Sequence, residues 1–88
     1  MIVYKVALLS YANNLMLPKT AKLLDVQLQR GEPTLWYSFD AGTEEVERQI
    51  LVFGTGQPAP YNRLAHIATV QSGDLVWHYF ENITHKPA

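Results

Sequence analysis

Apolar and polar residues alternate one by one from Leu24 to Arg30. In an extended segment Leu24, Val26 and Leu28 would share one face, and the polar residues between them would share the other. This period of two is typical of a half-buried strand, and no stretch of the chain shows a convincing helical period. Because apolar side chains that recur in this way are buried by pairing strands, the pattern restricts the fold to β-sheet.

Short runs rich in aliphatic, β-branched and aromatic residues, separated by Gly, Pro and Asn, indicate about six or seven strands. These runs cover residues 2–9, 15–18, 24–30, 35–39, 45–53, 64–71 and 75–81. We therefore predict an all-β domain, a small antiparallel sandwich or barrel, with room for one short helical turn between Glu44 and Ile50.

Turn-forming residues mark four of the connections. Arg30-Gly31-Glu32-Pro33 and Ser72-Gly73-Asp74 each predict a tight hairpin. Ala12-Asn13-Asn14 predicts a further turn. Gln57-Pro58-Ala59-Pro60 predicts an irregular surface loop, because its prolines have no amide hydrogen to donate to a strand ladder.

The chain has 88 residues, of which 48% are hydrophobic and 17% charged, and it has no cysteine. We expect one globular domain over residues 1–83 and a flexible tail over residues 84–88. Without cysteine there is no disulfide, no thiolate zinc site and no cysteine nucleophile. A domain of this size buries only about 60% of its unfolded surface, which favours self-association.

Charge and hydropathy exclude several classes of partner. Seven basic and eight acidic residues give a net charge of −1, so we expect no general binding to nucleic acid. The first ten residues lack the basic leader and cleavage site of a signal peptide. Because no apolar run approaches the roughly 18–20 residues that cross a bilayer, we expect a cytoplasmic protein that does not enter membranes.

Two of the expected strands carry large apolar residues on both faces. Leu35, Tyr37 and Phe39 would lie opposite Trp36, and the strand over residues 75–81 has the same property. In so small a domain a second layer can cover only one face. The other aromatic face would stay exposed as an apolar patch unless a partner covers it. We therefore expect a homo-oligomer, with a dimer favoured.

The candidate binding residues are a glycine-rich turn and a group of aromatic, basic and imidazole side chains. Clustered glycines can expose backbone amides to an anion, and aromatic rings can stack on a base while a guanidinium neutralises its phosphate. The predicted ligand-binding or partner-binding residues are Trp36, Arg48, Gly54, Thr55, Gly56, Gln57, Trp77 and His78.

Structural roles compete with these functional ones. Glycines also permit a tight exit from a strand, and the aromatic residues also suit an ordinary core. The three histidines, His66, His78 and His85, match no metal-binding motif, and no serine lies in a nucleophile elbow. We therefore predict no catalytic residue, no metal and no cofactor.

Three stretches carry a resemblance to a known family. They are Leu24–Trp36, Gly54–Pro58, and Ala68–Gln71 leading into Leu75–Glu81. In order and spacing they are similar to a family of short, uncharacterised bacteriophage and prophage proteins, a domain of unknown function, over residues 1–81. The loop of that family commonly reads Gly-Thr-Gly-His-Pro, and Gln57 stands here in place of its histidine. The resemblance implies a phage accessory factor and carries over no catalytic residue.

These observations together favour a non-enzymatic phage accessory protein in the host cytoplasm. It would act in counter-defence, by binding a host or defence protein or by sequestering a small nucleotide signal. One alternative is a structural or assembly protein of the virion, for which an oligomeric β-domain is also suited. The other is a small hydrolase with an active site centred on His78.

Overall fold

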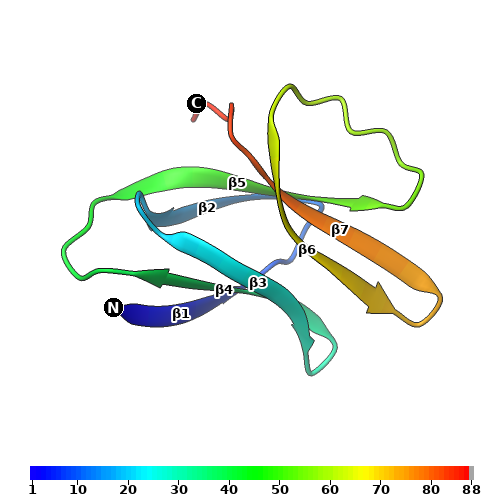
Figure 1. Ribbon diagram of the computed structural model, residues 1–88, viewed down its shortest axis with the longest axis horizontal. Coiled ribbons are helices and arrows are strands. Elements are labelled where there is room, and N and C mark those ends of the chain that lie inside the picture. The colour runs from blue at the N-terminus through cyan, green and yellow to red at the C-terminus, as the bar shows by residue number, and fades with distance from the viewer. Residues whose placement is uncertain (88) are drawn as a thin grey trace.

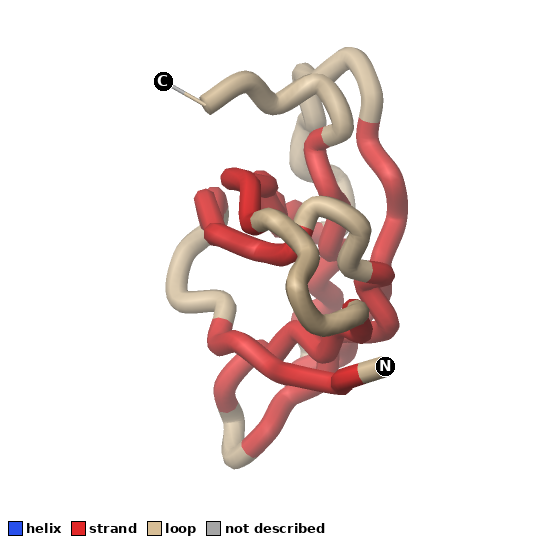
Figure 2. The backbone as a smooth tube through the Cα atoms, turned by 90° about the vertical axis from the view of Figure 1, so that its left-hand side faces the viewer, coloured by secondary structure: helices blue, strands red, loops and turns tan. Residues whose placement is uncertain are grey.

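The computed structural model describes residues 1–87 and contains seven strands (Figure 1). They are β1 (Ile2–Ala7), β2 (Ala12–Pro18), β3 (Lys22–Gln29), β4 (Glu32–Phe39), β5 (Glu45–Gly54), β6 (Leu64–Ser72) and β7 (Leu75–Asn82). Residues 1–87 form strands and loops only (Figure 2), which confirms the predicted all-β class. None of these residues belongs to a helix that could span a membrane.

The strands form two antiparallel sheets, one in the order β1-β4-β3 and the other in the order β2-β5-β7-β6. Both predicted hairpins are present. The first joins β3 to β4 through Arg30 and Gly31, whose φ angles of 52° and 81° are those that a two-residue hairpin turn requires. The second joins β6 to β7 near Gly73, where φ is 60°. The two sheets also meet where β3 contacts β6.

The core lies between the inner faces of the two sheets. In β4 the core residues Leu35 and Tyr37 alternate along the strand, and in β5 Ile50 and Val52 do the same, as a two-layer β-fold requires. The most deeply buried side chains come from both sheets: Val26 and Leu35 from one, Leu17 and Ile50 from the other. Each sheet therefore provides one wall of a single hydrophobic core.

The predicted turn at Ala12-Asn13-Asn14 is wrong, because all three residues belong to β2. The Asn13 side chain explains the difference. It is buried, it accepts a hydrogen bond from the Ser10 amide at 3.1 Å, and its amide group donates to the Ser10 carbonyl at 2.7 Å. The asparagine thus closes the preceding loop from within a strand.

The predicted shared face of Leu24, Val26 and Leu28 is also wrong in part. The register of β3 shifts between Leu23 and Asp25, so Leu24 lies in a bulge. Val26 is buried at 1% exposure, whereas Leu24 is 43% exposed. One extra residue in the strand has moved an apolar side chain out of the core.

The end of the chain is held against the second sheet as far as the structure describes it. The His85 ring lies 2.6 Å from the Glu47 carboxylate, and the His85 amide donates to the Asn82 carbonyl at 3.2 Å. Ala88, the last residue of the expected flexible tail, lies outside the described residues.

Candidate binding cleft

Three connections border a cleft of about 400 Å³. They are the loop between β1 and β2, the turn between β3 and β4, and the end of the β6–β7 hairpin. Its walls are mainly apolar and include Leu8, Leu9, Tyr11, Leu28, Pro33 and Trp77. The volume falls within the range of roughly 300–1,000 Å³ that is usual for ligand pockets.

Tyr11 and Trp77 form an aromatic wall of this cleft. Their ring centroids lie 6.0 Å apart, with the planes inclined by 46°. The Tyr11 carbonyl accepts a hydrogen bond from the Val52 amide at 3.0 Å, which ties the loop to β5. The indole packs beside Gly54, where a Cβ would lie 3.5 Å from Trp77 Cζ3, an ordinary van der Waals contact. The position of the wall is therefore set by backbone contacts as well as by the rings.

Tyr79 is the most buried of the aromatic residues that line the cleft, with 3% exposure. Burial raises the pKa of the Tyr79 phenol above its ordinary value of 10.0. At neutral pH the hydroxyl is therefore protonated and can donate a hydrogen bond.

The rim of the cleft is apolar and exposed. Leu9 is 80% and Tyr11 67% exposed, so both side chains are available to an incoming group. None of the described residues that line the cleft carries a formal charge. The cleft can therefore bury apolar surface, at about 25 cal/mol per Å², but offers no counter-charge to a phosphate.

The glycine-rich segment predicted as a binding loop forms a tight turn after β5. The Gln57 amide donates to the Gly54 carbonyl at 3.0 Å, and the Gln57 side-chain oxygen accepts from the Gly54 amide at 3.0 Å. Gly56 has a φ of 88°, which favours glycine. Gln57 thus holds the turn closed through two hydrogen bonds to the Gly54 backbone. Gly54 and Thr55 also border a second depression, beside Trp77 and Leu75.

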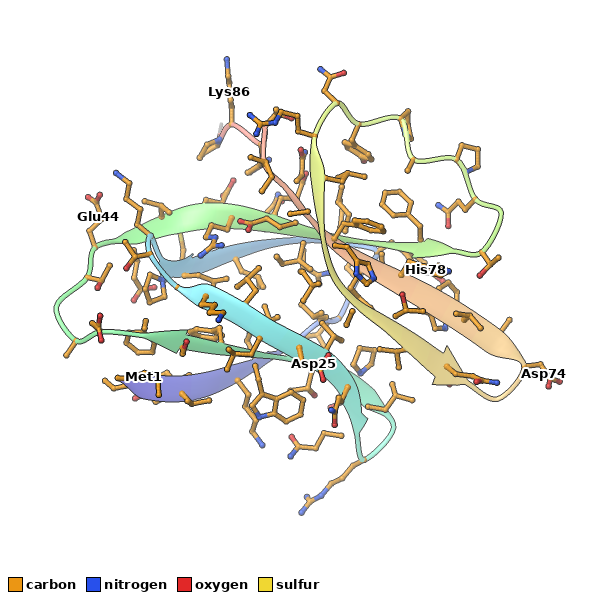
Figure 3. All side chains as sticks on the ribbon, in the orientation of Figure 1. Met1, Asp25, Glu44, Asp74, His78 and Lys86 are labelled. Atoms are coloured by element: carbon orange, nitrogen blue, oxygen red, sulfur yellow. The ribbon has the colours of Figure 1, made fainter. Side chains whose placement is uncertain are left out.

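His78 lies in a hydrogen-bonded row of side chains on the outer face of the second sheet. Its Nε2 is 2.8 Å from the Thr55 hydroxyl, and its Nδ1 is 3.2 Å from the Thr69 hydroxyl. The Thr69 hydroxyl is also 2.9 Å from Nε2 of His66. Figure 3 shows His78 on β7 near the point where β6 passes it, and Asp74 at the tip of the hairpin.

Arg48 and Trp36 lie apart from these residues. The Arg48 guanidinium makes a two-point ion pair with Glu81, at 2.6 and 2.7 Å, and donates to the Ala21 carbonyl at 2.8 Å. Trp36 lies in β4 between Leu35 and Tyr37, whose side chains face the core, so its indole is on the outer face of the first sheet. The structure thus places the turn over residues 54–57 next to both Trp77 and His78, which lie on opposite faces of β7. It separates Trp36 and Arg48 from this turn.

Sequence reasoning missed most of the cleft. Leu8, Leu9, Tyr11, Leu28 and Pro33 were not among the predicted binding residues, although they line it. The available signal was Tyr11, a large aromatic residue two positions before Asn13 in a segment otherwise typical of a turn. The rest depends on three connections meeting in space, which local patterns do not encode.

Residues 1–88 match the family described as Domain of unknown function (DUF7352). No curated protein and no solved structure matches the chain.

Proposed function

The chain belongs to the DUF7352 family of domains of unknown function, and we propose that it is a non-enzymatic binding domain whose cleft takes up an apolar side chain of a partner protein. One observation carries this proposal: an uncharged cleft walled by Tyr11 and Trp77 has exposed apolar residues at its rim. Aromatic residues in desolvated pockets dominate the energetics of protein interfaces, and exposed apolar patches mark such surfaces.

A partner protein suits this cleft better than a nucleotide does. A small nucleotide carries one or more phosphates, and its site would need cationic side chains or free backbone amides next to the stacking rings. The described lining offers rings without cations, and the Arg48 guanidinium is held by Glu81. Burial of an apolar side chain requires neither group.

The resemblance of the chain to short bacteriophage proteins supports a more specific version of the proposal. In that version the partner is a protein of the infected bacterium, and the domain acts in the host cytoplasm as an accessory or counter-defence factor. The cleft provides the contact, and the apolar rim around it excludes water from that contact.

The proposal is tested by site-specific photo-cross-linking in bacterial cells. A photoreactive phenylalanine analogue replaces Leu9 at the rim or, as a matched control, Gln27 on an exposed part of β3. We expect a discrete cross-linked partner from position 9 that is absent from position 27. Tyr11→Ser, a change at a 67% exposed side chain, should remove it without affecting the fold.

Two results would count against the proposal. One is a partner captured equally from both positions, and the other is a partner that persists in Tyr11→Ser. A cross-linked species of twice the chain mass would identify a second copy as the occupant. That result would support the expected dimer, which stays a prediction, and would overturn the proposed host partner.

A further inference from the structure

A second site of different chemistry lies on the outer face of the β2-β5-β7-β6 sheet. His66 and Thr69 come from β6 and His78 from β7, and Thr69 pairs directly with His78 across the ladder. The three side chains converge, because Nε2 of His66 and Nδ1 of His78 both lie beside the Thr69 hydroxyl oxygen, at 2.9 and 3.2 Å. This cluster is separate from the lining of the cleft.

These distances fit a set of metal ligands. Two donor atoms that each lie about 2.1 Å from one ion are about 3.0 Å apart when their bonds are perpendicular and about 3.4 Å apart in a tetrahedron. The two nitrogen-to-oxygen separations in the cluster fall close to this range. They are also the separations of ordinary hydrogen bonds, which an ion would replace. The described residues contain no group of three or more His, Cys, Asp or Glu side chains that could hold a metal ion, so the protein would supply two imidazole nitrogens and one hydroxyl oxygen.

The surroundings hold both rings in place. The His66 ring packs against Phe80, with ring centroids 5.2 Å apart. Nε2 of His78 is 2.8 Å from the Thr55 hydroxyl, which can accept its proton and leave the Nδ1 lone pair directed at the cluster. A metal-binding histidine usually donates its second ring nitrogen to such a partner.

We propose that His66, Thr69 and His78 form a binding site for a divalent transition-metal ion, with copper(II) bound more tightly than nickel or zinc. Imidazole nitrogens suit all three ions, and the affinity of a given nitrogen and oxygen site peaks at copper(II). Because His66 and Thr69 are exposed, water can fill the remaining coordination positions. The twelve-residue separation of the two histidines matches no linear motif, and only the hairpin brings them together.

The test uses the full chain with copper(II) chloride alone, in a buffer that does not bind copper. Calorimetric titration should give one equivalent of copper bound to the wild type, and the electron paramagnetic resonance spectrum should show two imidazole nitrogens. The variant that lacks both histidines, His66→Ala with His78→Ala, should lose this equivalent. Thr55→Val should weaken binding by about 10–100-fold, because it removes the partner that orients His78.

His85→Ala is the matched control. It also removes one histidine of the same sheet region, at the pair with Glu47, and should leave copper binding unchanged. Circular dichroism establishes that each variant is folded. The proposal is overturned if the double variant binds copper as the wild type does, or if the wild-type spectrum shows fewer than two imidazole nitrogens. Where the double variant fails to fold, His66→Ala and His78→Ala made singly should each reduce the spectrum to one imidazole nitrogen, and a spectrum that keeps two in either variant would overturn the proposal.

Discussion

At the scale of single residues, Arg48 illustrates how tertiary contacts decide the role of a side chain. Its sequence position suggested a cation available to a phosphate, whereas the structure commits its guanidinium to Glu81 and to the carbonyls of Pro18 and Ala21. Both partners of the ion pair are largely buried, with 15% and 14% of their side chains exposed. The pair therefore links β5 to β7 and to the connection before β3.

We expect Glu81→Gln to lower the free energy of unfolding by about 3 kcal/mol, because it leaves a buried guanidinium without its counter-charge. Urea unfolding at neutral pH measures the change. The matched control is Lys19→Gln, which breaks the exposed pair with Glu44 and should cost less than about 1 kcal/mol. If the two variants lost equal free energy of unfolding, the buried pair of Arg48 would contribute no more to stability than the exposed pair of Lys19.

Tyr79 predicts how stability depends on alkaline pH. Because burial raises its pKa in the folded state, the neutral phenol stabilises the fold fully below the unfolded pKa of about 10. This contribution is lost as the pH rises through the higher folded pKa. We expect stability to fall as the pH rises above about 10, and Tyr79→Phe to make that fall less steep. Urea unfolding of both proteins at about pH 8 and above pH 10 checks this; identical pH dependence would contradict it.

At the scale of elements, the strand patterns were largely predictable and their local irregularities were not. The predicted runs correspond to all seven strands, and both glycine-containing hairpins are present. The bulge at Leu24 and the inclusion of Asn13 in β2 were missed. The bulge lies in the pairing of β3 with β4, and Asn13 is part of β2 because it pairs with Ile50 of β5. Neither pairing can be inferred from the residues of one strand.

The bulge leads to different expected costs for two residues that look equivalent in the sequence. Val26→Ala should lower the free energy of unfolding by about 2 kcal/mol, because Val26 is 1% exposed and its loss leaves a cavity. Leu24→Ala, at 43% exposure, should cost less than about 1 kcal/mol. Chemical unfolding of the two variants measures both values. A larger cost at Leu24 would place it in the core and contradict the bulge.

At the scale of the whole molecule, the two sheets share one core. Leu35 and Val26 of the first sheet belong to the same buried cluster as Ile50 and Tyr79 of the second. The inner face of each sheet is buried by the other sheet, so neither face would stay buried if the sheets separated. The domain should therefore unfold as one cooperative unit.

The two tryptophans provide a test, since Trp36 lies in the first sheet and Trp77 in the second. We expect Trp36→Phe and Trp77→Phe each to unfold with a fluorescence midpoint equal to the midpoint of its own circular dichroism curve. Each single-tryptophan protein then reports on one sheet and serves as the control for the other. Separate midpoints within one variant would show that the sheets unfold independently.

The sequence by itself determined the class of the fold, the positions of the hairpins and the dependence of stability on packing without disulfides. These properties follow from short-range patterns: a period of two, glycines at turns and the absence of cysteine. Only the tertiary structure decided that Leu24 is exposed and that Arg48 pairs with Glu81. It alone decided that Tyr11, Leu28 and Trp77 border one cleft. It also decided that His66 and His78 meet beside Thr69. The physical reason is that these arrangements depend on the register and crossing of strands distant in sequence, which are set by the packing of the whole core.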